Sequence, residues 1–245
     1  RQLLGAARTL VIMGLTDNIL ARLEHLTIQD EQQRRNVWQT VQSILRFEHD
    51  FLNEIQRDRL TTLSKQLYGD SFHDRVHRFV GKAASIDEEI TDPSDRGALQ
   101  AIIADLADEA YHHPAELRAE LPWLASQDAE NVWFFGRRLG MLDEHHEWLQ
   151  DIFVAVDASK DYAFSSAYLQ GCADAGADTW LKHLFDEWVL DPTKASLILD
   201  ATWRGDTDAR NLERVLELVD KGWIEPQDLR AFAFGGWVRG LTATQ

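Results

Sequence analysis

The string GRRLG at residues 136–140 places two glycines four residues apart near the end of an apolar stretch, and related strings recur three times. These are AYLQG (167–171), ATWRG (201–205) and GWVRG (236–240), whose final glycines follow one another after 31, 34 and 35 residues. Residues four apart lie on one face of a helix, so a small residue paired with glycine predicts close approach by a neighbouring helix. We expect these strings to pack helices together and not to bind a ligand.

The spacing of these glycines predicts a repeat. After each of the first three comes a polar turn and an apolar helix centred on Trp148-Leu149, Trp180-Leu181 or Asn211-Leu212, and a second helix then runs into the next glycine. Two helices in 31–35 residues are typical of an α-solenoid, here a right-handed superhelical array of HEAT- or TPR-like pairs. Each glycine is expected to end its helix in the left-handed conformation. Asp178-Thr179 and Asp206–Asp208 are expected N-caps.

Helical periodicity dominates the rest of the sequence, which predicts an all-α protein of about fourteen helices. Prolines follow His113, Asp191 and Glu225, where a first-turn proline can begin a helix. The apolar stripes are Ile19, Leu20, Leu23 and Leu26; Val37, Trp38, Val41, Ile44 and Leu45; Phe51, Leu52 and Ile55; Leu99, Ile102, Ile103 and Leu106; and Leu212, Val215, Leu216 and Val219.

One polar, acidic segment, KAASIDEEITDPSDRG (82–97), predicts a boundary. We expect an N-terminal helical lobe over 1–82, an acidic loop or hinge over 83–97 and a helical-repeat lobe over 98–245. Eight of the nine tryptophans lie from residue 123 onward, so the composition also changes beyond this segment.

The overall charge disfavours nucleic acid as a partner. The 245 residues carry a net charge of −16, with −6 before residue 126 and −10 after it, which predicts acidity spread along the chain and repulsion of a phosphate backbone. No apolar run approaches the length of about 18 residues that a membrane span needs. A single cysteine, Cys172, excludes an internal disulfide and favours a reducing cytoplasmic setting with an inert thiol. Because the sequence lacks an initiating Met, we expect a piece of a longer protein.

Only one histidine pair has the spacing of a metal site. HDRVHRF (73–79) places His73 and His77 one helical turn apart, although no third ligand can be identified and pairing of Asp74 with Arg78 on a polar helix face is the simpler interpretation. In DEHHEW (143–148) and AYHHPAEL (110–117) the histidines are adjacent and point about 100° apart, which disfavours a shared metal. No cofactor is expected.

Arginines and tryptophans near the strings are the candidates for partner binding. Arg138, Arg204 and Arg239 recur near helix ends, where a cation complements the helix dipole or could grip an acidic partner. Trp223 and Trp237 are the tryptophans expected to cover an interface as apolar anchors.

The stretch FFGRRLG…AYLQG…ILDATWRG…FAFGGWVRGL resembles the helical-repeat C-terminal regions of large bacterial multidomain proteins, over residues 126–245. In such proteins the region follows an effector or NTPase module, and several act in antiphage defence. The resemblance implies an array that senses a trigger, binds a partner or assembles the effector, and it supplies no catalytic residues.

The sequence therefore predicts a non-catalytic α-helical module that recognises another protein, or another domain of the same chain, and homo-oligomer assembly is compatible with this role. The alternative is a helical metal-dependent hydrolase built on His73, His77 and nearby carboxylates. A third interpretation is a purely structural spacer.

Overall fold

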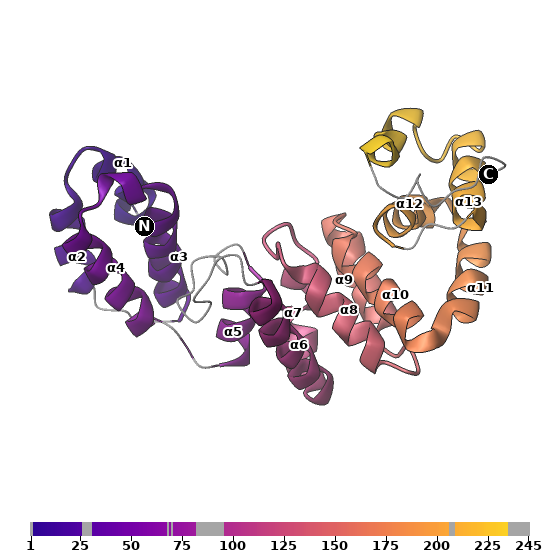
Figure 1. Cartoon of the computed structure of the whole chain (residues 1–245), viewed down its shortest axis with the longest axis horizontal. Coiled ribbons are helices and arrows are strands. Elements are labelled where there is room, and N and C mark those ends of the chain that lie inside the picture. The colour runs from indigo at the N-terminus through magenta and orange to yellow at the C-terminus, as the bar shows by residue number, and fades with distance from the viewer. Residues whose placement is uncertain are drawn as a thin grey trace. The chain divides into compact units, whose positions relative to one another are not determined.

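The computed structural model describes residues 2–25, 31–67, 69, 71–81, 96–205 and 209–234. These residues form helices joined by turns, without a β-strand among them, so the prediction of an all-α protein is confirmed (Figure 1). The chain divides into two compact units, Arg1–Arg78 with Ala83–Arg96 and Phe79–Lys82 with Gly97–Gln245. The predicted acidic loop lies outside the described residues up to position 95.

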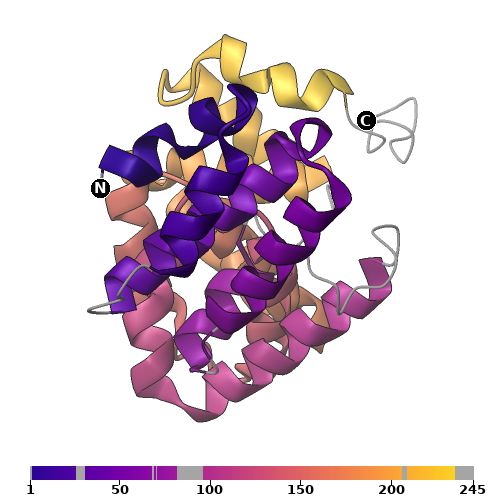
Figure 2. The ribbon, with the colours of Figure 1, turned by 90° about the vertical axis from the view of Figure 1, so that its left-hand side faces the viewer.

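The first unit is a small helical bundle (Figures 1 and 2). Helix α1 packs on α2 and α3, and α4 packs on α2 and α3. A buried hydrogen bond of 2.6 Å from Gln42 Nε2 to Ser64 Oγ also joins α3 to α4. The elements are α1 (Gln2–Ile12), α2 (Thr16–Glu24), α3 (Glu31–Phe47), η1 (His49–Phe51), α4 (Glu54–Leu67) and α5 (Phe72–Phe79).

Two of the predicted apolar stripes form the core of this bundle. Ile19 and Leu20 of α2 are buried, and Val37, Val41 and Ile44 of α3 meet them in one cluster with Leu60 and Leu63 of α4. The stripe through Phe51 and Ile55 was wrong in part, because both side chains are exposed and only Leu52 is buried. The cause is a break in the helix: η1 ends at Phe51 and α4 begins at Glu54, which changes the direction of the side chains.

The second unit contains the predicted repeat region. Its helices are α6 (Arg96–His112), α7 (Pro114–Leu124), α8 (Val132–Leu142), α9 (Leu149–Ser159), α10 (Ala163–Cys172), α11 (Asp178–Trp188), α12 (Ala195–Arg204) and α13 (Ala209–Asp220). Shorter helical segments are η3 (Ala173–Ala177), η4 (Pro192–Lys194) and η5 (Pro226–Phe234). Arg96, the first residue of α6, is counted with the first unit. The prolines at 114, 192 and 226 each stand at the first position of a helix, as predicted.

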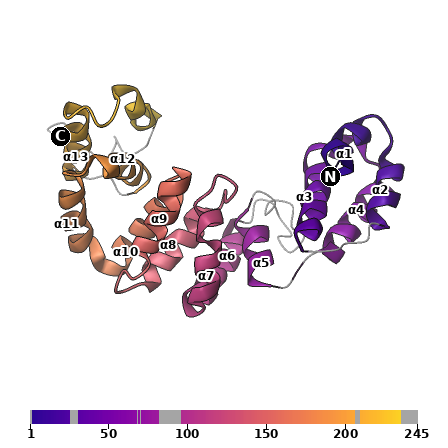
Figure 3. The ribbon, with the colours of Figure 1, turned by 180° about the vertical axis from the view of Figure 1, so that it is seen from behind.

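The first two glycine strings pack against each other. Helices α8 and α10 lie side by side (Figures 1 and 3). A Cβ atom on Gly140 would overlap the carbonyl oxygen of Tyr168, one on Gly171 would overlap that of Arg137, and one on Gly136 would lie 2.9 Å from the Cβ of Ala167. Only glycine permits this backbone contact, so the packing interpretation is confirmed for GRRLG and AYLQG.

The predicted left-handed helix ends are wrong at these positions. Gly140 and Gly171 lie inside α8 and α10, and Gly205 follows α12 with φ −90° and ψ −167°. After Gly171 the chain stays helical through η3 and bends at Gly176, whose φ of 99° needs glycine, before α11 begins. Gly236 and Gly240 lie outside the described residues.

The predicted helix positions and N-caps also need correction. Trp148-Leu149 and Trp180-Leu181 stand at the beginnings of α9 and α11 and not at their centres. Asp178 makes no capping hydrogen bond because Ala177 occupies the N-cap position, and Asp206–Asp208 lie outside the described residues. Asp191 does cap η4, accepting the Thr193 N–H at 2.9 Å.

A second hydrophobic core lies among the last described helices of this unit. Val215 and Leu218 of α13 pack with Ile198 of α12, together with Ile224 and Phe232. Arg214 is the largest fully buried side chain, and it bonds Asp186 and the Lys182 carbonyl, which fastens α13 to α11. In the stripe predicted for α13, Leu216 is exposed and the others are buried or half-buried.

The charge divides unequally between the two units. The first carries a net charge of −3 and the second −13, so both units are acidic and the second, larger unit holds most of the excess. Among the described residues, every helix is too short or too polar to cross a bilayer.

Candidate functional site

The predicted partner-binding arginines that the structure describes are paired inside the chain. Arg138 of α8 makes two hydrogen bonds of 2.6 and 3.0 Å to the carboxylate of Asp108 on α6. Arg204 bonds Asp200 one turn earlier on α12 and lies over the ring of Trp203. Each guanidinium therefore has a carboxylate in place of the external acidic group that the sequence suggested. Arg239 lies outside the described residues.

Of the two predicted apolar anchors, the structure describes only Trp223. Trp223 is half-buried against the C-terminal core, and the Lys221 ammonium lies 4.8 Å from its ring centre. Its indole thus packs within the unit, which leaves it only partly accessible to a partner. Trp237 lies outside the described residues. The three described candidates for partner binding, Arg138, Arg204 and Trp223, do not lie on one helix.

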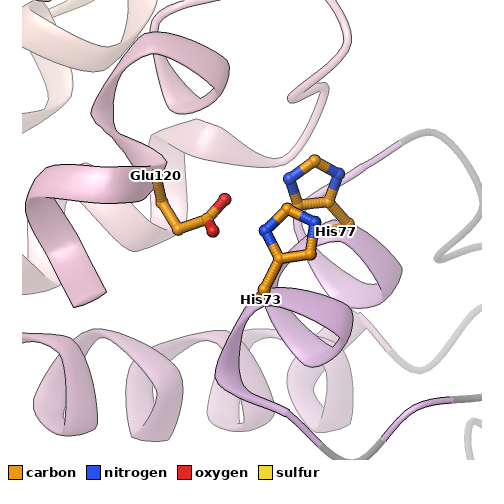
Figure 4. A group of neighbouring side chains, drawn as sticks. All are labelled: His73, His77 and Glu120. Atoms are coloured by element: carbon orange, nitrogen blue, oxygen red, sulfur yellow. The ribbon is translucent and has the colours of Figure 1, made fainter. Parts of the chain in front are cut away.

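The histidines of HDRVHRF lie on α5, as predicted. His73 and His77 are half-buried, and their rings lie one above the other with centres 4.0 Å apart and an angle of 38° between the planes. Figure 4 shows both rings, together with Glu120, a carboxylate of α7 with 5% exposure. Glu120 belongs to the second unit, so the donors that α5 itself supplies are the two imidazoles.

A charged network supports the first turn of α5. Arg34 of α3 donates to the Asp74 carboxylate at 2.7 Å and to the Leu67 carbonyl at 2.7 Å, while the Ser71 hydroxyl donates to Asp74 at 2.6 Å. These hydrogen bonds hold the pKa of Asp74 below its ordinary value despite partial burial. The sequence suggested Arg78 as the partner of Asp74, and the structure provides Arg34, forty residues earlier.

The acidic string DEHHEW forms a structural cap. Asp143 has 1% exposure, and its carboxylate accepts hydrogen bonds from the N–H groups of Glu147 and Trp148 at 3.0 and 2.9 Å. The Tyr168 hydroxyl donates to it at 2.6 Å. Asp143 therefore closes the start of α9 and ties it to α10.

The other side chains near this cap that could carry chemistry are buried, stacked or too far apart to act together. Burial raises the pKa of the Cys172 thiol to about 12, and burial also raises the pKa of Tyr168. Cys172 is thus an inert thiol, as predicted. His146 stacks on Trp180 with ring centres 3.6 Å apart, in a left-handed backbone conformation, and His145 is exposed. The two histidines do not converge on one point.

An open groove between α7 and α9 was not predicted. Its volume is about 560 Å³, and Arg118 and Asp151 form an ion pair of 3.0 Å within its lining. Val154 of this lining has 63% exposure. The remaining lining residues are Leu121, Pro122, Ala155, Ala158 and Ser159. They are ordinary residues from two helices about thirty positions apart, and no local sequence signal marks them.

No protein-family model, curated protein or solved structure matches this chain.

Proposed function

We propose that this chain is a non-catalytic helical module that binds another protein, or another domain of its own parent chain, in the groove between α7 and α9. The groove is the observation that carries the proposal. It is open to solvent, most of its lining residues are apolar, and its two charged lining residues are paired with each other. Such a surface fits side chains of a helix or extended segment and offers no converging set of reactive groups.

The exposed side chains of the groove suggest what would occupy it. Val154, Ala158 and Pro122 present small apolar surfaces to solvent on facing helices. Small side chains at this spacing leave room for larger apolar residues of a partner helix, one turn apart. Burial of this surface would contribute about 25 cal/mol for each Å² removed from water.

Charge selects among partners that share such an apolar face. The second unit has 26 acidic and 13 basic residues, whereas the two charges in the groove neutralise each other. A field of this sign accelerates association with a cationic segment and disfavours an acidic one. The proposed partner is therefore a basic amphipathic helix, and not the acidic peptide that the arginines had suggested.

The packing of the repeat region supports a scaffold role. Helix α8 packs on α10 and α10 on α12, while α7 packs on α9, so alternate helices contact each other in sequence. This succession is what a stacked array of helix pairs would give, and we propose a solenoid on this basis. With the resemblance of residues 126–245 to the helical-repeat regions of large bacterial proteins, this extends the proposal to the antiphage role that the resemblance implies.

The test is a binding measurement with a labelled amphipathic helical peptide of leucine and lysine. Fluorescence anisotropy should show binding to the wild-type chain, and a scrambled peptide of the same charge should bind more weakly. Val154→Asn combined with Ala158→Gln should weaken binding at least about tenfold, or about 1.4 kcal/mol. Leu190→Asn, an equally exposed apolar position outside the groove, is the matched control. Equal binding of both peptides, or equal loss in the control, would contradict the proposal.

A further inference from the structure

We propose that α5 is a binding site for a first-row divalent metal ion, with His73 and His77 as its two protein nitrogen ligands. A ring nitrogen of His73 lies within 4.8 Å of a ring nitrogen of His77. A bond of about 2.0–2.1 Å from each nitrogen to one zinc ion requires this proximity, with a small rotation of the rings. The spacing of one helical turn supplies it from within a single helix.

The rotation of α5 about its axis is fixed, which determines where the histidines lie. Phe72, Val76 and Phe79 are buried and occupy one face of the helix. His73 and His77 each follow a buried residue by one position, so both imidazoles lie on the flank of that buried face. Each is half-buried, and side chains in such positions lose less entropy when a metal orders them.

Both ends of α5 are also held. At its start, the Ser71 hydroxyl accepts the Asp74 N–H at 3.2 Å, while Arg34 binds the Asp74 carboxylate. After its end, Asn131 donates to the carbonyls of Phe79 and Gly81 at 3.3 Å, and its own N–H reaches that of Val80 at 2.9 Å. The helix that carries the two ligands is thus a fixed support, as a metal site requires.

The chemistry of the donors selects the class of ion. Imidazole nitrogen suits zinc, copper and nickel, whereas calcium and magnesium prefer oxygen. Two arginines line the same recess as His77: Arg34, whose guanidinium is paired with Asp74, and Arg78. Water or carboxylate oxygen would complete the coordination. The site is independent of the groove between α7 and α9, so one proposal can fail without the other.

The experiment is a titration of the full chain, free of affinity tags, with Cu²⁺ and with Zn²⁺. It is run near neutral pH, because an imidazole binds a metal ion through an unprotonated ring nitrogen. Electron paramagnetic resonance should show two nitrogen ligands on one Cu²⁺ per chain, and Zn²⁺ should raise the melting temperature. His73→Gln and His77→Gln should each weaken binding at least about tenfold. Gln keeps a polar side chain of similar length, and circular dichroism checks that the variants fold.

His145→Gln is the matched control, because His145 is exposed and belongs to an adjacent histidine pair. Loss of binding confined to the two α5 variants would support the site. An absence of tight binding in the wild-type chain, or the same loss in the control, would overturn it.

Discussion

Gly140 of α8 and Tyr168 of α10 touch backbone to backbone, so closely that a single methyl group at Gly140 has no space. We expect Gly140→Ala to lower the free energy of unfolding by about 1–3 kcal/mol, because the two helices must separate. The gain in helix propensity from alanine, about 1 kcal/mol, offsets only part of this loss. Urea unfolding measures the change. Gly97→Ala, at an exposed position of α6, should not destabilise the protein; equal effects of the two changes would contradict the packing explanation.

The buried Asp143 carboxylate gives a second prediction. Tyr168→Phe removes the hydroxyl that donates to Asp143 and should cost about 1.5–3 kcal/mol, the range for a hydrogen bond to a charged group. Asp143→Ala should cost more, since it also leaves the buried N–H of Trp148 without its acceptor. Thermal unfolding compares both with Glu144→Gln, an exposed neighbour. A neutral effect of Tyr168→Phe would show that this bond adds nothing to stability.

The reactivity of the Cys172 thiol can be measured as its rate of alkylation. Because burial raises the pKa of this thiol to about 12, only about one thiol in ten thousand is ionised at pH 8. We expect iodoacetamide to modify the native protein very slowly and the urea-unfolded protein at the rate of an ordinary thiol. As this is the only cysteine, mass spectrometry of the whole chain suffices. Rapid labelling of the folded chain would contradict a buried, inert thiol.

The ion pair of Asp186 and Arg214 predicts a pH dependence. Hydrogen bonds from Arg214, and then from Arg210, lower the pKa of Asp186 from its ordinary 3.8. The unfolded chain therefore binds a proton more readily, and the stabilisation present above pH 3.8 is lost as pH falls through the folded-state value. Asp186 is partly exposed, so the contribution should stay below about 1 kcal/mol.

The measurement is the stability of wild type minus that of Asp186→Asn as a function of pH. This difference should be constant near neutrality and shrink below about pH 4. Glu187→Gln, at the exposed adjacent position, should leave the acid profile of wild type unchanged. A difference that grows on acidification would reverse the sign of the prediction.

Periodicity and small-residue spacing were sufficient to predict the helices and one contact between them. Gly136, Gly140 and Gly171 were recognised as packing residues because the absence of a side chain has a direct steric meaning. The left-handed helix ends could not be predicted in the same way. A glycine serves equally for close approach and for a helix end, and only the position of the neighbouring helix decides between them.

The candidate sites depended more strongly on tertiary structure. The spacing of His73 and His77 is a property of one helix, so the sequence predicted it correctly. The carboxylate that binds Arg138 comes from another helix, and hydrogen bonding to it makes an expected recognition residue part of the internal structure. The groove needed both α7 and α9 in place, since neither helix carries a distinctive motif.

The bend at Gly176 has a mechanical consequence. Because the backbone leaves helical geometry at Gly176, α11 joins α10 through a sharp change of direction and is not a continuation of the same helix. By contrast, α10 is clamped to α8 by contacts between bare backbones. Under applied force α8 and α10 should therefore move as one piece, and α11 should detach at Gly176 before the contact between α8 and α10 yields.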